Sequence, residues 1–304
     1  MTGQRTAESI ALRFAVSAAI IGAIVPAPLG AQTKCQGPDN NRMWFITASN
    51  ITLLRTMDAA LTQHFFDNNC TYALASPSTA AGIPGWSSIP TATFTSYADF
   101  QTAINKKSIA PTVKAVTYDD ESWSSTPANE QANPALYTQM FSSLAHANGY
   151  LFISTPGTDL VSVMPGYNSK NTEQQEFLRL GVATFSAKVA DIFEIQGQSQ
   201  EYVASQYVSY IASVAAQAKQ ASPSVVLMAG ITTNEKNGNV PTADELYQAV
   251  IQTGGLVSGY WLNIPETGPP CSSCTVTEPQ IAVDFLRELE AHPLNSPPFR
   301  RKRP

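Results

Sequence analysis

The fold of this chain is decided by a stretch that begins with 191-DIFEIQ-196 and ends with 225-VVLMAG-230. Both runs are short and rich in apolar residues, which is typical of buried strands. Residues 199–220 lie between them with helical spacing, and we expect Ser199 to be the N-cap of that helix. A strand, a helix and a second strand in this order predict two parallel strands joined by a crossover.

The same alternation continues on both sides of this stretch. The Ser/Pro/Gly-rich residues 76–90 read as a loop, and Asn133 with Pro134 opens one of the helices. The strands are expected at 43–47, 72–75, 91–94, 113–118, 151–154, 191–196, 225–230 and 257–264. Further helices are expected at 53–66, 97–105, 134–148, 173–187, 242–254 and 277–292.

Eight such units predict a single (β/α)₈ TIM barrel, which typically needs about 250 residues. An open, doubly wound sheet is the alternative fold. It is disfavoured because residues 46–50, which end the first strand, contain no glycine-rich nucleotide loop.

The N-terminal residues have the pattern of a signal peptide. Arg5 and Arg13 precede an apolar run over residues 14–25, and Gly30 and Ala31 offer small residues for cleavage. We therefore expect a secreted protein with a signal peptide at 1–31, a barrel domain at 32–298 and a basic, disordered tail at 299–304. The apolar run is too short to span a membrane.

The composition limits the kinds of molecule that this protein is expected to bind. The net charge of −5 opposes nucleic-acid binding, and charged residues make up only 13% of the 304 residues. We expect a monomer that binds carbohydrate or another small polar ligand, without nucleic-acid or membrane partners.

The four cysteines fit an oxidising compartment and allow three pairings. We favour disulfides between Cys35 and Cys70 and between Cys271 and Cys274. The second pair could also form a redox CxxC motif or half a zinc site. Neither alternative is favoured, because the sequence has no second CxxC motif and no histidine near this one.

Carboxylates cluster at the end of the fourth expected strand, in 118-YDDESW-123. Side chains alternate along a strand, so Asp119 and Glu121 should both face the barrel mouth. Two close carboxyls raise one another's pKa, which suits Glu121 to general acid catalysis. We also expect Asp120 and Trp123 to bind substrate. The alternatives are that Asp120 and Glu121 are solvated loop charges or helix caps, or that Asp119, Asp120 and Glu121 hold a metal.

Two other strand ends carry polar or aromatic side chains. Glu194 and Gln196 share the inward face of the sixth strand, and Trp261 and Asn263 share one face of the eighth. We expect all four to contact substrate, with Trp261 stacking on a sugar ring. The alternatives are a structural hydrogen-bond network for Glu194 and core packing for Trp261.

The sequence lacks the residue patterns that other common catalytic sites require. The three histidines, His64, His146 and His292, lie in expected helices or at a helix end, and none lies at a strand end. No G-x-S-x-G elbow, zinc-ligand spacing or phosphate-binding loop is present. We therefore expect neither a cofactor nor a metal.

Asp119-x-Glu121 after the fourth strand, Gln196 after the sixth and Trp261 on the eighth resemble the layout of glycoside hydrolase family 18, the chitinase-type barrels. The resemblance implies that Glu121 protonates the glycosidic oxygen and that Asp119 orients the substrate's acetamido group. It also implies that Trp261 forms the floor of a sugar subsite. The family's two upstream aspartates are replaced here by Lys114 and Thr117.

Three functions are consistent with these residues. The first is a secreted glycoside hydrolase with Glu121 as general acid and Asp119 as orienting carboxylate. The second is a non-catalytic barrel that binds carbohydrate or another polar ligand. The third is a different hydrolase, or a carbon–oxygen lyase, that acts on a secreted small molecule.

Overall fold

The computed structural model describes residues 35, 37 and 42–293. The expected signal peptide, 1–31, and the expected basic tail, 299–304, lie outside these residues. In the described part of the chain, no helix is both long and apolar enough to cross a lipid bilayer.

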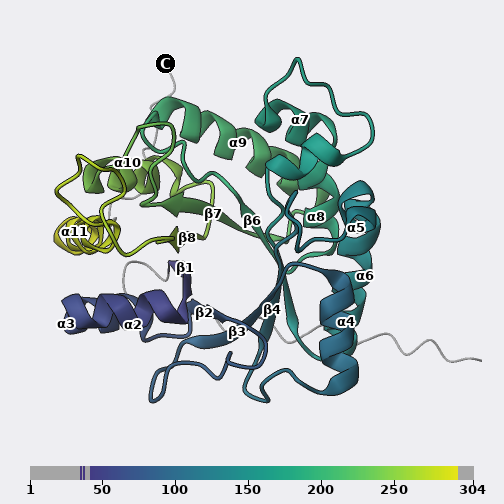
Figure 1. The fold of residues 1–304 in the computed structure, drawn as a ribbon, viewed down its shortest axis with the longest axis horizontal. Coiled ribbons are helices and arrows are strands. Elements are labelled where there is room, and N and C mark those ends of the chain that lie inside the picture. Colours follow the sequence, from purple (N-terminus) through teal and green to yellow (C-terminus); the bar gives the residue numbers. More distant parts are fainter. Residues whose placement is uncertain (1–34, 36, 38–41, 294–304) are drawn as a thin grey trace, which may run out of the picture. The chain divides into compact units, whose positions relative to one another are not determined.

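Eight parallel strands close into a barrel, each paired with the next along the chain and the last paired with the first (Figure 1). The prediction of a single TIM barrel is confirmed, and the open sheet is excluded. The strands are β1 Met43–Thr47, β2 Thr71–Ala75, β3 Ile89–Phe94, β4 Ala115–Tyr118, β5 Leu151–Ser154, β6 Ile192–Ile195, β7 Val226–Thr232 and β8 Gly259–Asn263.

Helices follow every strand except β2, whose connection to β3 over residues 76–88 contains no helix (Figure 1). They are α2 Ala48–Met57, α3 Ala59–Phe66, α4 Tyr97–Lys106, α5 Ala128–Ala132, α6 Pro134–Ala147, α7 Glu173–Arg179, α8 Val182–Val189, α9 Ala204–Ala221, α10 Ala243–Thr253 and α11 Glu278–Ala291, with a 3₁₀ turn, η1, at Asp159–Val163.

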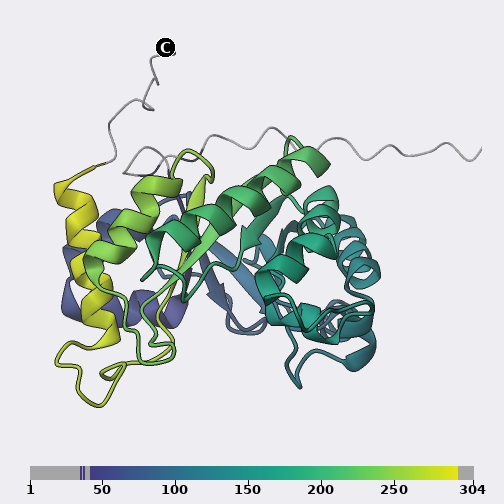
Figure 2. The ribbon, with the colours of Figure 1, turned by 90° about the horizontal axis from the view of Figure 1, so that it is seen from above.

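The last helix closes the ring by packing on the first two. In Figures 1 and 2 the yellow α11 lies beside the purple α2 and α3. Arg287 of α11 donates to the carboxylate of Asp58, between α2 and α3, at 3.1 Å. The first and last units of the barrel are therefore joined both through β1–β8 pairing and through their helices.

Two helices expected to be continuous are each broken. The segment expected at 53–66 starts earlier, at Ala48, because Thr47 caps α2. It breaks at Asp58, whose side chain accepts the backbone N–H of Leu61 and so caps a second helix, α3. The segment expected at 173–187 breaks at Gly181, which has a φ of 74°. That left-handed conformation costs glycine little and cannot continue a helix.

Ser199 is not the N-cap of the long helix. It has a φ of 65°, whereas an N-cap residue is normally extended, and α9 starts at Ala204 after Val203. Residues 197–203 are instead a loop at the cavity described below. By contrast, the expected capping box of Thr242 and Glu245 at the start of α10 is confirmed.

The strands separate two apolar regions because their side chains alternate. Phe193 and Ile195 pack outward against the helices, while Ile192 packs inward. The inward cluster fills the lower barrel and consists of Met43, Phe45, Tyr72, Leu74, Ala115, Ile153, Ile192, Met228 and Trp261.

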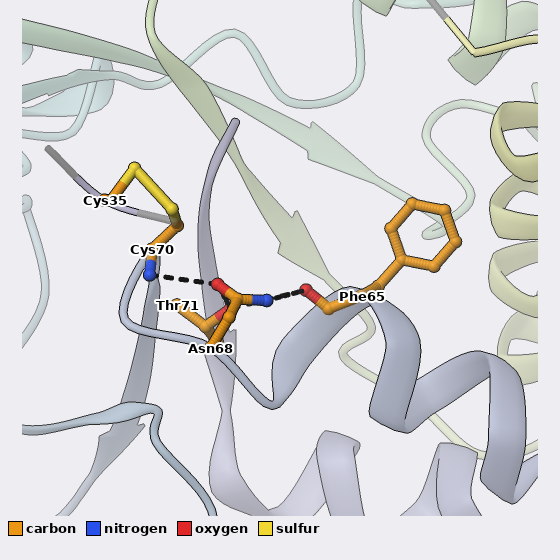
Figure 3. The surroundings of a disulfide bond; sticks show 5 residues. All are labelled: Cys35, Phe65, Asn68, Cys70 and Thr71. Carbon is orange, nitrogen blue, oxygen red and sulfur yellow. Dashed lines mark hydrogen bonds between the residues drawn. A yellow bond between two sulfur atoms is a disulfide. The ribbon is translucent and has the colours of Figure 1, made fainter. Parts of the chain in front are cut away.

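Both expected disulfides are confirmed. Cys35 packs against the inward cluster and is bonded to Cys70, directly before β2 (Figure 3). Asn68 stabilises this corner, because its side chain accepts the N–H of Cys70 at 2.9 Å and donates to the carbonyl of Phe65 at 2.8 Å (Figure 3). The Cys271–Cys274 bond lies in the loop between β8 and α11.

Candidate active site

A cavity of about 460 Å³ lies at the carboxyl ends of the strands, where TIM-barrel enzymes carry their active sites. Six residues expected at the strand ends line it together: Asp119, Glu121, Trp123, Gln196, Trp261 and Asn263. Six further lining residues follow the strands and were not expected; two of them begin η1 and α7 and the others lie in loops: Thr158, Asp159, Glu173, Gln198, Ser199 and Lys236.

Gln196 holds the two expected catalytic carboxyls in place. Its side-chain Nε2 donates to Glu121 Oε1 at 2.9 Å and lies 3.3 Å from Asp119 Oδ1. The same nitrogen donates to the carbonyl of Thr155 at 3.0 Å, and the Thr155 hydroxyl donates to Asp119 Oδ1 at 3.0 Å. The segments that follow β4, β5 and β6 are thus joined by the Gln196 amide, which fixes both carboxyls at the cavity.

The environment of this pair favours protonated carboxyls. Burial raises the pKa of Asp119, an effect partly opposed by the hydrogen bond from Thr155 and increased by the charge of Asp159. Burial also raises the pKa of Glu121, and the charge of Asp119 adds to that shift. A carboxyl that keeps its proton near neutral pH can serve as a general acid.

Asp159 brings a third carboxyl beside the pair. It follows β5 at the start of η1 and accepts a hydrogen bond from the Ser122 hydroxyl at 2.6 Å. The backbone of Gly157 approaches closely here, because a Cβ on Gly157 would lie 2.5 Å from both Glu121 Cγ and Asp159 Oδ1. Glycine is therefore required where the loop after β5 meets these two side chains.

Asp120 does not line the cavity. It is only 1% exposed, so it is not a solvated loop charge. It follows Tyr118 on the outward face, and neither of its side-chain oxygens has a hydrogen-bond partner in the described part of the chain. Burial raises its pKa. The charges of Asp119 and Glu121 raise the pKa of Asp120 further, but among the described residues no group of three or more carboxylate, histidine or cysteine side chains is arranged to hold a metal ion.

Glu194 lies inside the barrel, on the same face as Gln196, but is fully buried and does not line the cavity. Burial raises its pKa, and the charges of Asp119 and Glu121 raise it further. Neither carboxyl oxygen has a hydrogen-bond partner among the described residues. The alternative expectation of a structural hydrogen-bond network around Glu194 is therefore wrong for the described residues.

The loop after β6 brings Gln198 and Ser199 to the cavity. Gln198 packs so closely on β7 that a Cβ at Gly230 would lie 2.2 Å from its side-chain Cδ. Glu201, fully buried, accepts the backbone N–H of Thr232 at 2.8 Å and so ties the same loop to β7. These residues were missed because the sequence suggested a helix here. The positive φ of Ser199 has no clear sequence signal.

Two tryptophans flank the carboxyls, with different surroundings. Trp123 is 43% exposed, whereas Trp261 is 9% exposed and also belongs to the inward cluster. Core packing and a place in the cavity wall are therefore both true of Trp261. An exposed indole face beside hydrogen-bonding groups can stack on a sugar ring.

No protein-family model matches the chain, and no curated protein is a significant match. Membership of glycoside hydrolase family 18 therefore stays a prediction. A structure of a curdlan-specific exo-β-1,3-glucanase from Blastomyces gilchristii, in complex with glucose, is 10% identical, with a TM-score of 0.48 over 81% of this chain and 96% of that one.

Two chitinase structures are similar to a comparable degree. The active domain 2 of the thermostable chitinase from Pyrococcus furiosus is 12% identical, with a TM-score of 0.48 over 87% of this chain and 98% of that one. A chitinase from Chromobacterium violaceum is 10% identical, with a TM-score of 0.46 over 82% and 98%.

Proposed function

We propose that this protein is a secreted glycoside hydrolase that cleaves a carbohydrate with Glu121 as general acid and Asp119 as orienting carboxylate. The observation that carries the proposal is the Gln196 amide, which holds both carboxyls at one cavity between the strand ends. The exposed ring of Trp123 offers an apolar surface for a sugar ring, and the largely buried Trp261 lines the same cavity.

The proposed reaction breaks the bond between the anomeric carbon and the leaving-group oxygen. Glu121 gives its proton to that oxygen, which also takes the bonding electron pair. Asp119 orients the group that attacks the anomeric carbon, which the family resemblance identifies as the acetamido oxygen of an N-acetylated sugar. The carboxylate left on Glu121 then takes a proton from the water that completes hydrolysis.

Secretion is part of the proposal. The two disulfides support it, since such bonds persist in oxidising compartments. The expected signal peptide at 1–31 provides the export signal.

The test is release of reducing ends from chito-, laminari- and cello-oligosaccharides by the purified protein and its variants. Glu121→Gln should lower the rate by about 10²–10⁴, because glutamine cannot donate the proton, while ligand affinity stays within a few-fold. Asp119→Asn should lower the rate less. Glu290→Gln, on the exposed end of α11, is the matched control and should leave the rate unchanged.

The outcome separates the competing functions. Full activity of Glu121→Gln would exclude Glu121 as the general acid. Binding of an oligosaccharide without release by the unmodified protein would favour the non-catalytic barrel. Activity on a non-carbohydrate substrate alone would favour the third interpretation.

A further inference from the structure

Gln198 lines the cavity with a side-chain amide that has no hydrogen-bond partner in the described part of the chain. Its Oε1 is buried without a partner, whereas its Nε2 is not buried and has N–H groups to donate. Gln196, two residues earlier, is different, because its two N–H groups are already donated to Glu121 and to the carbonyl of Thr155. Of these two glutamines, Gln198 is therefore the one that can donate to a ligand.

The inner face of β7 is shaped to receive this amide. Gly230 lies on that face, two residues after Met228 of the inward cluster. A Cβ on Gly230 would lie 2.2 Å from Gln198 Cδ and 2.4 Å from both Nε2 and Oε1, and these are the three atoms nearest to it. The amide thus fills the space in which β7 would otherwise place a side chain. Glycine is required here by this contact and not by its backbone, because its φ is not positive.

The loop that carries Gln198 is fixed on both sides of this residue. Gly197 packs on α9, since a Cβ there would lie 2.7 Å from Tyr207 Cε2. Glu201 ties the other side to β7 by accepting the N–H of Thr232 at 2.8 Å. The amide is therefore held in place before a ligand arrives, which lowers the entropy cost of binding.

The amide belongs to a neutral wall of the cavity, formed by Gln198, Trp261 and Asn263. Gly230 is paired in register with Trp261, so Gln198 lies beside that indole on the inner face of β7 and β8. The Asn263 side chain hydrogen-bonds to none of the described residues. In the ring of eight strands, β8 is opposite β4, after which the two proposed catalytic carboxyls follow. A ligand between the two sides would meet carboxyls on one side and uncharged N–H groups on the other.

We infer that Gln198 is a substrate-binding residue whose Nε2 donates a hydrogen bond to an uncharged oxygen of the sugar, a ring hydroxyl or an acetamido carbonyl. The inference rests on the proposed function and adds a specificity-determining residue to it. A neutral donor suits an uncharged acceptor, because neither has to lose a hydrated charge on binding. The wall lies away from the carboxyls, so this hydrogen bond should form equally in the bound substrate and in the transition state. Its loss should then raise KM and leave kcat nearly unchanged.

The first experiment measures binding of the N-acetylglucosamine trimer by calorimetric titration, in a Glu121→Gln background so that the trimer is not cleaved. Gln198→Met keeps the side-chain length but removes the donor, and should raise Kd about 5-fold. Gln198→Glu should raise Kd further, because a carboxylate can only accept and repels the sugar oxygen. Gln252→Met, at an exposed position near the end of α10, is the matched control and should leave Kd unchanged.

Cellotriose, which has a hydroxyl in place of each acetamido group, identifies the acceptor. A similar loss for both trimers in Gln198→Met assigns a hydroxyl, and a loss for the N-acetylated trimer alone assigns the carbonyl. In the active protein, Gln198→Met should raise KM about 5-fold and lower kcat less than 2-fold.

The second experiment moves the amide without removing it. Gly230→Ala places a Cβ where the amide of Gln198 lies, and should also raise the Kd of the N-acetylated trimer about 5-fold. In a Gln198→Ala background the same change should alter Kd less than 2-fold, because the amide no longer occupies that space. Urea unfolding should show no loss of stability in Gly230→Ala, since the displaced atoms are the end of a flexible side chain.

Unchanged Kd and KM in Gln198→Met would overturn the inference, as would equal effects of Gly230→Ala in the presence and absence of the Gln198 amide. The proposed function would survive these results if Glu121→Gln still stopped release of reducing ends. If the unmodified protein neither binds nor cleaves any of the oligosaccharides, both the proposed function and this inference are wrong.

Discussion

At the scale of single residues, the charge of Asp119 helps to set the protonation of Glu121. Burial, with the charge of Asp119, raises the pKa of Glu121 to about 8, so the acid form persists through neutral pH and is lost above it. We expect the rate of hydrolysis to fall as pH rises through that value. Asp119→Asn removes the neighbouring charge and should move the alkaline decline to lower pH. A pH–rate profile whose alkaline limb is unmoved in Asp119→Asn would contradict this coupling.

Glu194 should affect stability more than rate. Its pKa is higher in the folded chain than in the unfolded chain, so the folded state binds more protons. The stability it contributes is complete below the ordinary glutamate pKa and is lost as pH rises toward the folded value. We expect the free energy of unfolding, measured in urea at pH 5, 6.5 and 8, to fall less with rising pH in Glu194→Gln than in the unmodified protein. Parallel pH dependences would exclude this role.

Alternation along strands could predict Asp119, Glu121 and Trp261, because a period of two fixes which side chains face inward. The same rule placed Glu194 inward, although it could not show that its carboxyl would lack partners. Asp159 and Lys236 could not be predicted in this way. Asp159 begins the short turn η1 and Lys236 lies in a loop, and in neither place does a strand period relate sequence position to side-chain direction.

At the scale of elements, the capping box of Thr242 and Glu245 predicted the start of α10, whereas the expected N-cap at Ser199 was wrong and apolar spacing did not predict where two helices break. Thr242 accepts the N–H of Glu245 at the start of α10, as expected, whereas the breaks at Asp58 and Gly181 depend on local backbone geometry within apolar-rich segments. Thr242→Ala should lower the free energy of unfolding by about 1 kcal/mol, because the capping hydrogen bonds are lost. Ser213→Ala, at an exposed position inside α9, should change it by less than about 0.5 kcal/mol in the same urea titration. Similar losses in both variants would contradict a capping role.

At the scale of the whole molecule, counting strand–helix units predicted the closed barrel. The cysteines indicated an oxidising compartment, and the favoured one of their three possible pairings is the one the structure has. The Cys35–Cys70 bond spans 35 positions and the Cys271–Cys274 bond spans 3. Chain entropy then predicts that replacing the first pair by alanine costs about 4 kcal/mol and the second about 2 kcal/mol. Urea unfolding of the two double variants measures this difference. Equal losses would show that local geometry outweighs loop length.

The missing helix between β2 and β3 has a consequence for how the barrel opens (Figure 1). Elsewhere a helix must detach before solvent reaches the outer face of a strand, but here only the loop at 76–88 has to move. Pro90 in β3 also has no N–H to donate to the ladder. The amide protons of β2 and β3 should therefore exchange with deuterated solvent before those of β6 and β7. We expect the barrel to open first between β2 and β3.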